Sequence, residues 1–363
     1  MDNDIITNDK INEEPLDPMD AQIERDVCEE AWLRMEILRG SPAGKYFTEP
    51  KLRKTVLNDM KRETNKKIET MNSGDENDDD NKSDGRGLYD NINYINSLFV
   101  IINHILAIYS IQYINSYRTF FELLIQYQVC AMSITAGTHR LWSHRSYKAS
   151  DPFRFMLMLF ISMCNQGSIF HWVRDHRIHH KYSDTDADPH NINNGFFFSH
   201  VGWLLTLKNE KVIEAGKKID CSDLLNDWVV VLNKKLWPYG DLFMGYIVPS
   251  LYGYYVYDSW LKGFLIFGCL RWVILSHATW SVNSFAHTYG YKTFRNINPS
   301  DNKYVSLVSA GEGWHNWHHT YPMDYACSDE GIFLRWNPTK LFIDIFSLFG
   351  QTYDHKRIKK RIR

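Results

Sequence analysis

Nine of the 15 histidines in this 363-residue sequence stand in four short groups. The groups are HRLWSH at 139–144, HRIHH at 176–180, NSFAH at 283–287 and HNWHH at 315–319. In both HxxHH groups the first histidine lies three and four residues before the other two, so on a helix all three rings project from neighbouring faces. Imidazole nitrogens placed in this way can converge on a metal ion. The sequence therefore predicts a metal site built from these groups.

The intervals in the other two groups make different demands on the backbone. Asn283 precedes His287 by four residues, which is about one turn of a helix. His139 and His144 are five residues apart, and this interval turns the side chain by about 140° on an ideal α-helix. We therefore predict that this pair marks a helix end, where the backbone leaves the helical path and both rings can still point inward.

The number of histidines indicates more than one metal ion. One ion rarely takes more than about six protein ligands, so eight or nine histidines imply two ions. Imidazole suits iron, zinc, copper and nickel, and the ligand type alone leaves the metal open. Soluble di-iron bundles generally use Glu and ExxH pairs, and none of the four groups contains ExxH. We interpret the groups as an all-nitrogen dinuclear centre of redox-active iron.

The histidines outside these groups have a simpler interpretation, as packing or hydrogen-bonding residues. They are His104, His171, His190, His200, His277 and His355. Among them, His190 and His200 are also candidates for supporting the metal ligands. A single HxxH pair on a helix is often a surface accident, but two HxxHH groups and an HxxxxH pair beside apolar segments favour metal binding.

The elements that position these groups are predicted to be membrane-spanning helices. Residues 92–114 contain no Asp, Glu, Lys or Arg over 23 positions, enough to cross ~30 Å of hydrocarbon at ~1.5 Å per residue. Three further segments extend this pattern. The four expected spans are residues 92–114, 120–138, 242–257 and 263–286. Residues 155–164 are apolar over only ten positions, which favours an interfacial or buried helix.

The order of spans and histidines predicts the topology. Each group follows the second or the fourth span, so with two hairpins all groups lie on one side together with both termini. Residues 356–363 hold six Lys and Arg, and the positive-inside tendency makes that side cytosolic. Arg271, inside the fourth span, is expected to face protein or lie near an interface. The fold class is an all-α integral membrane protein with a cytosolic helical cap; buried helices of a soluble protein are the alternative.

Composition and charge argue against several classes of protein. With 41 Lys and Arg against 43 Asp and Glu, the chain lacks the basic excess of a nucleic-acid-binding protein. The six cysteines form no CxxC and support neither a disulfide framework nor a cysteine zinc site. The amino terminus lacks the apolar core of a secretory signal peptide.

The predicted domain organisation has three parts. Residues 1–90 form a polar, largely disordered extension with short helices over 20–38 and 51–70. Residues 91–350 form the membrane domain, and residues 351–363 form a basic tail.

The segments around the histidines resemble a known family. HRLWSH, HRIHH and HNWHH resemble the three histidine boxes of membrane fatty-acid desaturases. Hydroxylases share such boxes, but the flanking segments are closer still to the acyl-CoA Δ9 (stearoyl-CoA) desaturases. These segments are TAGTHRLWSHRSYKA, WVRDHRIHHKYSDTDADPHN, GFFFSHVGWLL, ATWSVNSFAHTYGY and GEGWHNWHHTYPMDY. The resemblance covers about residues 90–350, whereas residues 1–85 carry none.

The resemblance implies a cone of four transmembrane helices capped by a cytosolic domain, with two iron ions bound by nine histidines. The implied ligands are His139, His144, His176, His179, His180, His287, His315, His318 and His319. It also implies that Asn283 holds a metal-bound water. The division of the ligands between the two irons stays open.

The same resemblance implies a kinked tunnel for an acyl chain and a site for CoA. The positions that match the bend of the tunnel are Gln166, Trp172, Thr279 and Trp280. Tyr127 and Ala131 match its closed end, and the positions that match CoA contacts are Arg174, Asp175 and Lys208. Leu207 and Gly167 depart from the family, which has Arg and Asn at these positions in the animal enzymes. Core packing is the alternative for Trp172 and Trp280.

The implied activity is that of an acyl-CoA Δ9 desaturase, which inserts a cis double bond into saturated sixteen- to eighteen-carbon fatty acyl-CoA with dioxygen and two electrons. The sequence contains no HPGG haem-binding motif and no GxGxxG motif, so a separate electron carrier is expected. By resemblance this carrier is cytochrome b5 with its reductase, in the endoplasmic reticulum membrane. The alternatives are a membrane fatty-acid hydroxylase, a desaturase of another lipid carrier and, from another class, a histidine-rich metal transporter.

Overall fold

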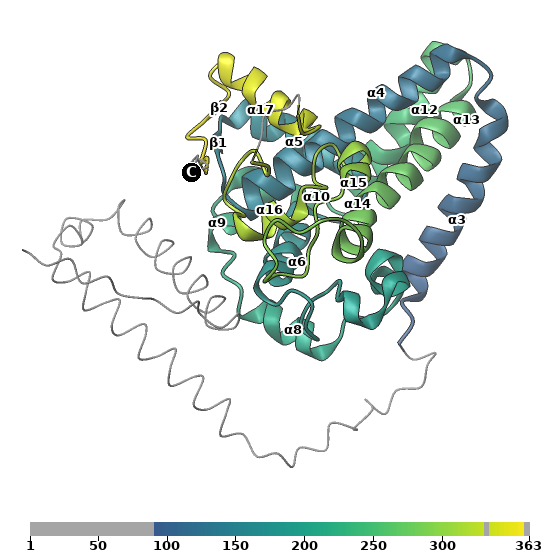
Figure 1. The fold of residues 1–363 in the computed structure, drawn as a ribbon. Coiled ribbons are helices and arrows are strands. Elements are labelled where there is room, and N and C mark those ends of the chain that lie inside the picture. The colour runs from purple at the N-terminus through teal and green to yellow at the C-terminus, as the bar shows by residue number, and fades with distance from the viewer. Residues whose placement is uncertain (1–90, 330–333, 359–363) are drawn as a thin grey trace, which may run out of the picture. The chain divides into compact units, whose positions relative to one another are not determined.

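The computed structural model describes residues 91–329 and 334–358, and helices make up most of the described chain (Figure 1). The chain divides into two units, Met1–Gly85 and Arg86–Arg363, and all described residues belong to the second. The predicted extension over residues 1–90, its short helices and residues 359–363 of the basic tail lie outside the described residues.

The first two expected spans are each a continuous helical segment. Helix α3 (Tyr94–Ser110) continues as the 3-10 turn η2 (Ile111–Tyr113), and helix α4 (Tyr117–Ser133) continues as the π-helix η3 (Ile134–Ser143). Both begin at a side-chain cap, because Asn93 accepts a hydrogen bond from the Asn96 amide and Ser116 accepts one from the Thr119 amide.

The last two expected spans form a second pair of helical segments. Helix α11 (Tyr239–Leu242), π-helix η6 (Phe243–Ile247) and helix α12 (Val248–Tyr257) follow one another without a break. After a short turn, helix α13 (Trp260–Lys262), π-helix η7 (Gly263–Leu270) and helix α14 (Arg271–Thr288) do the same.

Two helices of the described residues are long and apolar enough to cross a membrane, Tyr94–Tyr113 and Trp260–Thr288. They correspond to the first and fourth expected spans. A third candidate is the pair α5 (Asp151–Cys164) and α6 (Ile169–Lys181), which is bent by 83°. The second and third expected spans are helical but do not meet the same measure, so the four-span topology stays a prediction.

Helix α5 and the residues around it hold the largest apolar core. The expected short helix over 155–164 begins earlier, at Asp151, because the Ser150 hydroxyl accepts a hydrogen bond from the Phe153 amide. Leu157 and Ile161 of α5 are buried against residues of α6, α10 (Trp228–Leu236) and α17 (Pro338–Leu348). This core supports one side of the histidine groups.

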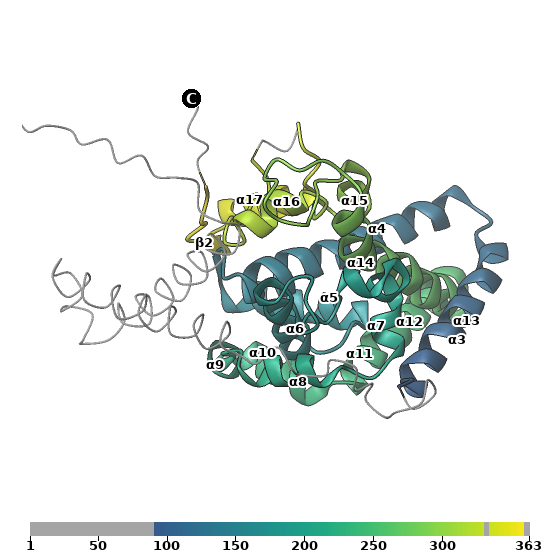
Figure 2. The same cartoon turned by 60° about the horizontal axis from the view of Figure 1, so that its bottom comes forward.

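Short elements complete the described unit (Figures 1 and 2). They are β1 (Lys148–Ala149), η4 (Ile192–Asn194), η5 (Phe198–Gly202), α7 (Trp203–Leu205), α8 (Glu210–Lys217), α9 (Ser222–Leu225), α15 (Lys303–Val308), α16 (His315–Thr320) and β2 (Thr352–Tyr353). Strands β1 and β2 pair antiparallel, with Lys148 opposite Tyr353. In both views α3, α12 and α13 stand together, on the side away from α8 and α9.

Arg271 is fully buried and faces protein, which confirms one of the two expected placements. Its Nε donates to the Phe267 carbonyl at 2.6 Å, and its Nη2 donates to the carbonyls of Met163 at 2.8 Å and Gly245 at 3.2 Å. The guanidinium therefore joins η7 to η6 and to the end of α5, and three carbonyls share its charge.

The two helices of the second pair approach closely where both carry glycine. A Cβ added at Gly253 would overlap the backbone of Gly263, and a Cβ added at Gly263 would overlap the Pro249 carbonyl. Small residues permit such close backbone contact between helices in a membrane.

We predict that Gly263→Ala destabilises the protein by about 3 kcal/mol, because backbone atoms on both helices must move to admit one methyl group. Thermal unfolding in detergent measures this. Gly216→Ala is the matched control, since its added Cβ would meet only the flexible ends of Ile178 and Arg174 at 3.3 Å or more. Equal melting temperatures for the two variants would contradict the prediction.

Candidate metal centre

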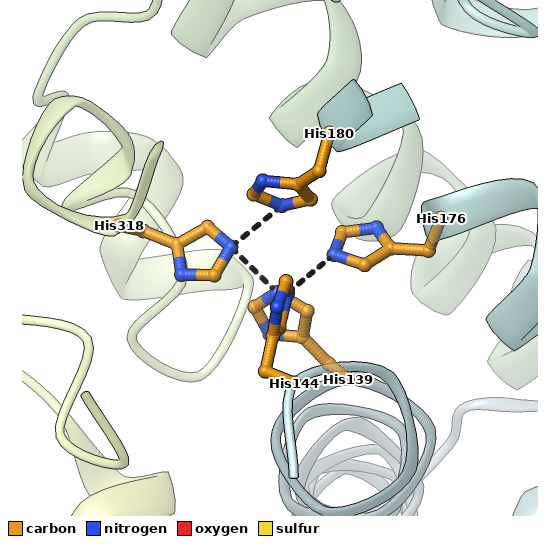
Figure 3. A group of neighbouring side chains, drawn as sticks. All are labelled: His139, His144, His176, His180 and His318. Atoms are coloured by element: carbon orange, nitrogen blue, oxygen red, sulfur yellow. Dashed lines mark hydrogen bonds between the residues drawn. The ribbon is translucent and has the colours of Figure 1, made fainter. Parts of the chain in front are cut away.

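Five histidines from three segments point ring nitrogens at one another (Figure 3). Each offers one nitrogen, and the five nitrogens all lie within 4.8 Å of one another. We call these residues the five-histidine group: His139, His144, His176, His180 and His318. The Nε2–Nε2 distances are 2.8 Å for His144–His176, 3.0 Å for His139–His318 and 3.0 Å for His318–His180.

A π-helix brings His139 and His144 to the same side. His139 lies inside η3, and His144 follows its last residue. The His144 amide donates to the His139 carbonyl at 3.2 Å, the i to i+5 bond of a π-helical turn, so five residues complete about one turn. The helix does end here and both rings point inward, as predicted, but the backbone departs from the α-helix by becoming a π-helix and leaves the helical path only at His144.

Four further histidines form a second cluster. We call it the four-histidine group: His179, His287, His315 and His319. His315 Nε2 lies 3.1 Å from His287 Nε2 and 3.0 Å from His319 Nε2. The structure thus brings all nine predicted histidines together and divides them five to four, which the spacing had left open.

Helices α6 and α16 each contribute to both groups. On α6, His176 and His180 are one turn apart and enter the five-histidine group, whereas His179 is turned by about 100° from His180 and enters the other. The groups adjoin, because the rings of His180 and His319 stack with centroids 4.3 Å apart. One HxxHH helix therefore serves two neighbouring positions.

Two aspartates orient rings of the four-histidine group. His179 Nδ1 lies 2.9 Å from Asp188, and His287 Nδ1 lies 3.1 Å from Asp184. Burial opposes charge on His179, but the Asp188 carboxylate outweighs burial and raises the pKa of His179. Carboxylates in this position fix the tautomer of a metal-binding histidine and increase its basicity.

A glutamate and a cysteine stand behind the five-histidine group. His139 Nδ1 lies 2.9 Å from Glu312 Oε2, an ion-pair distance without the alignment of a hydrogen bond. Burial opposes ionisation of Glu312, but the Arg140 guanidinium at 2.7 Å and His139 lower the pKa of Glu312 to about 2. His318 Nδ1 lies 3.5 Å from Cys327 Sγ.

The positions of the ring hydrogens show whether the histidines fit a cation. If Nδ1 of His139 and of His318 carry hydrogens toward Glu312 and Cys327, the facing Nε2 atoms are two lone pairs 3.0 Å apart. Two lone pairs at that distance repel unless positive charge lies between them. Nitrogens bound to one ion at about 2.1 Å and at right angles are also about 3.0 Å apart. His179 Nε2 is buried and has no hydrogen-bond partner. The nine rings fit metal ions.

Protons do not supply that positive charge to most of the rings. Burial, followed by repulsion between neighbouring rings, lowers the pKa of six of the nine far below the ordinary value. These six are His144, His176, His180, His315, His318 and His319. Near neutral pH these rings are therefore neutral, which is the form that binds a metal ion.

An apolar cavity borders the two groups. Its apolar lining includes Ala131, Ile134, Leu275, Ala278 and Val282, and its histidines include members of both groups. Among the positions implied for the acyl tunnel and its water ligand, Ala131, Trp172, Thr279 and Asn283 line this cavity. Gln166 lies beside it and donates to the Thr279 hydroxyl at 3.1 Å.

Tyr127 and Trp280 lie in different places. Tyr127 packs in one apolar cluster with Ala131, and its hydroxyl donates to the Val308 carbonyl. Trp280 packs against Val100 and Trp272 and does not line the cavity. Trp280 therefore lies in an apolar core, in agreement with the alternative interpretation that it is a core-packing residue.

A second cavity gathers the residues implied for CoA. Arg174, Asp175 and Lys208 all line it. Lys208 forms an ion pair with Asp175, and Arg174 Nη2 lies 3.2 Å from the same carboxylate. Leu207 is 46% exposed and does not line this cavity.

Known proteins share this sequence over most of the described unit. The sequence pattern of the family described as Fatty acid desaturase matches residues 120–326. The chain belongs to the fatty acid desaturase family.

The relatives confirm the resemblance seen in the histidine boxes. This desaturase is 43% identical over 290 residues to the acyl-CoA desaturase of Ovis aries, covering 78% of the chain and 80% of that protein. It is 43% identical over 279 residues to stearoyl-CoA desaturase 5 of Homo sapiens, covering 76% of the chain and 84% of that protein. It is 43% identical over 271 residues to acyl-CoA desaturase 3 of Mus musculus, covering 73% of the chain and 74% of that protein.

Sequence reasoning missed the residues that contact the predicted ligand histidines from behind. Asp184, Asp188, Glu312 and Cys327 all lie outside helices, and helical spacing gives no signal for them. A weaker signal exists, since Glu312 lies three residues before His315, and the aspartates closely follow HRIHH. The predicted support from His190 is indirect, because its amide donates to Asp188 at 2.9 Å.

We predict that Glu312→Gln weakens metal retention by about 10- to 100-fold, because His139 loses its anionic partner and the Arg140 charge stays buried. Metal content after timed exposure to a chelator measures this. Asp354→Asn is the control, since its ion pair with Lys148 is more than half exposed. If both variants lose metal at the wild-type rate, Glu312 does not support the centre.

Proposed function

We propose that this desaturase inserts a cis Δ9 double bond into saturated sixteen- to eighteen-carbon fatty acyl-CoA. The observation that carries the proposal is the pair of histidine groups bordering an apolar cavity. The identity of 43% to proteins named acyl-CoA desaturase and stearoyl-CoA desaturase supports CoA as the carrier.

The proposed cofactor is a pair of iron ions. The five-histidine group holds one ion, and the four-histidine group holds the other, with Asn283 binding a water on that ion from the wall of the same cavity. When bound, iron supplies the dioxygen chemistry that removes hydrogen from unactivated methylene carbons. A redox-active metal suits this reaction because dioxygen must be activated to attack an unactivated methylene group.

The balance of the reaction defines what else must reach the site. Two hydrogens leave adjacent carbons of the substrate as the double bond forms. One dioxygen takes up these hydrogens together with two electrons and two protons, and two waters result. The sequence has neither HPGG nor GxGxxG, and the proposed source of the electrons is a partner, cytochrome b5 with its reductase.

The cavity is proposed to position the acyl chain and to exclude water from the metal ions. Ala131, Ile134 and Leu275 present hydrocarbon to the acyl chain and exclude water from the metal ions. The hydrogen-bonded pair Gln166 and Thr279 is proposed to mark the bend of the chain, with Trp172 on its wall. Trp280 is proposed to support the bend from the neighbouring core.

The second cavity is proposed to hold CoA. Arg174 and Lys208 offer two cations to phosphate groups, and Asp175 keeps both in place before the substrate arrives. Cations on flexible side chains bind phosphate well, and Arg can do so through two parallel hydrogen bonds. Leu207 adds no charge beside Lys208, so this cavity relies on fewer cations than the animal enzymes have.

The proposed setting is the endoplasmic reticulum membrane. Four spans in two hairpins place the helical cap and both termini in the cytosol, where CoA and cytochrome b5 are available. The two helices that meet the length and hydropathy measure support the first and last of these spans.

We predict that His180→Ala and His318→Ala each lower double-bond formation by at least about a hundredfold, because each removes a ligand nitrogen near the centre of the five-histidine group. Gas chromatography of lipids from a desaturase-deficient yeast expressing each variant measures the product. His355→Ala is the control, since His355 packs beside Tyr147 and Tyr325, away from both groups. A gain of one oxygen in place of the loss of two hydrogens would indicate a hydroxylase instead.

We predict that Tyr127→Ala raises turnover of chains longer than eighteen carbons, relative to stearoyl-CoA, by at least about tenfold. The reason is that the ring of Tyr127 packs with Ala131 at the proposed closed end of the tunnel. Competition between acyl-CoA substrates of different length measures this ratio. Ile125→Ala, on the exposed side of the same helix, is the control, and an unchanged ratio in Tyr127→Ala would refute the assignment.

A further inference from the structure

Three histidines outside both metal-binding groups form a continuous chain of hydrogen bonds. His104 lies on α3, His277 on α14 and His200 in η5. His104 Nε2 lies 3.0 Å from His277 Nε2, and His277 Nδ1 lies 2.9 Å from His200 Nε2. The central ring thus uses both of its nitrogens. The chain joins the first candidate span to the last and to the segment that follows the aspartates of the metal centre.

The chain ends on the protein at both sides. His104 Nδ1 lies 2.7 Å from the Val100 carbonyl, and His200 Nδ1 lies 2.8 Å from the Ser284 hydroxyl. The Val100 oxygen can only accept, so neutral His104 donates to it, His277 donates to His104, and His200 donates to His277. The Ser284 hydroxyl lies beside His200 Nδ1 and donates to the Trp280 carbonyl at 3.0 Å.

Two of the three histidines lie in candidate membrane spans, where polar side chains are energetically costly. His104 lies in the middle of the candidate span Tyr94–Tyr113, and His277 is an exposed residue of the candidate span Trp260–Thr288. In hydrocarbon an unpaired polar group costs several kcal/mol, so each ring depends on its neighbours in the chain. Polar residues at this depth are functional candidates by default.

The chain ends next to residues that build the four-histidine group. Ser284 follows Asn283 directly and lies one turn before His287 on α14. His200 lies in η5, which follows the loop that carries Asp184 and Asp188. Aromatic contacts extend the same attachment, since the rings of Phe196 and Phe285 lie 4.8 Å apart. The link between His200 and Ser284 therefore holds the aspartate-bearing segment against the helix whose histidine one of those aspartates orients.

We propose that His104, His277 and His200 are positioning residues that hold α14 in register with α3 and η5, and thereby place Asn283 and His287 at the four-histidine group. The proposal rests on the metal centre of the proposed function. The chain acts by geometry, because none of its three rings belongs to either group.

Three single variants of the full chain, purified in detergent with iron bound, test the proposal. His277→Leu removes both central links, whereas His277→Asn keeps an amide that can donate on one side and accept on the other. Asn103→Leu is the matched control, because Asn103 neighbours His104 on α3 and accepts a hydrogen bond from Tyr246, away from α14 and η5. Each protein is exposed to a chelator, and iron per chain is followed over time beside thermal unfolding.

We expect His277→Leu to lose one of its two irons about tenfold faster than wild type, at the lower end of the effect of residues that support metal ligands. His277→Asn should release iron near the wild-type rate. Asn103→Leu should melt at a lower temperature without faster iron loss. Wild-type iron retention in His277→Leu, or equal loss in His277→Leu and His277→Asn, would overturn the proposal.

A second cut in the chain keeps the test valid if His277→Leu does not fold. His104→Leu interrupts the chain from α3 and should speed iron loss to the same extent, whereas retention at the wild-type rate would overturn the proposal. Where both single variants fold, the double variant should lose iron no faster than either, since one break already releases the chain. Purified wild-type protein that turns over stearoyl-CoA yet holds no iron would contradict the proposed function and this inference together.

Discussion

The structure depends on one electrostatic problem, the gathering of nine imidazoles into two buried groups in which five pairs of ring nitrogens approach to about 3 Å. Burial keeps most of these rings neutral, and neutral rings with outward Nδ1 hydrogens face each other with lone pairs. Only cations between them turn this repulsion into binding. Metal binding to these groups would therefore be linked to folding, because an ion would attach rings that otherwise repel one another.

The two histidine groups differ in the carboxylates that lie behind their rings. The five-histidine group has more nitrogens but only one carboxylate behind it, Glu312, whose charge is shared with the buried Arg140. The four-histidine group has fewer nitrogens and two aspartates, Asp184 and Asp188. The two groups therefore differ both in the number of their ring nitrogens and in the negative charge behind them.

Spacing predicted the parts of the site that follow helical periodicity. The HxxHH groups lie on α6 and α16 and the Asn283–His287 interval on α14, as expected, because i, i+3 and i+4 positions share a face whatever surrounds them. The supporting acids escaped prediction because they come from loops, whose positions depend on tertiary contacts. Trp280 matched a tunnel position by resemblance, yet packs in a separate core with Val100 of α3 and with Trp272 of its own helix α14. The five-residue interval of HRLWSH was misjudged because the reasoning assumed an ideal α-helix.

Departures from the ideal helix recur in the described unit, and Arg271 shows how the protein accommodates them. The π-helices η6 and η7 lie within the segments expected to cross the membrane, and η3 begins in the second of these segments and extends beyond it to the aligned pair His139 and His144. A π-helical turn shifts backbone hydrogen bonds and disturbs carbonyls that water cannot reach in a bilayer. The Arg271 guanidinium donates to carbonyls of η6, η7 and the end of α5. A charge that would be costly in lipid thus stabilises the irregular turns η6 and η7.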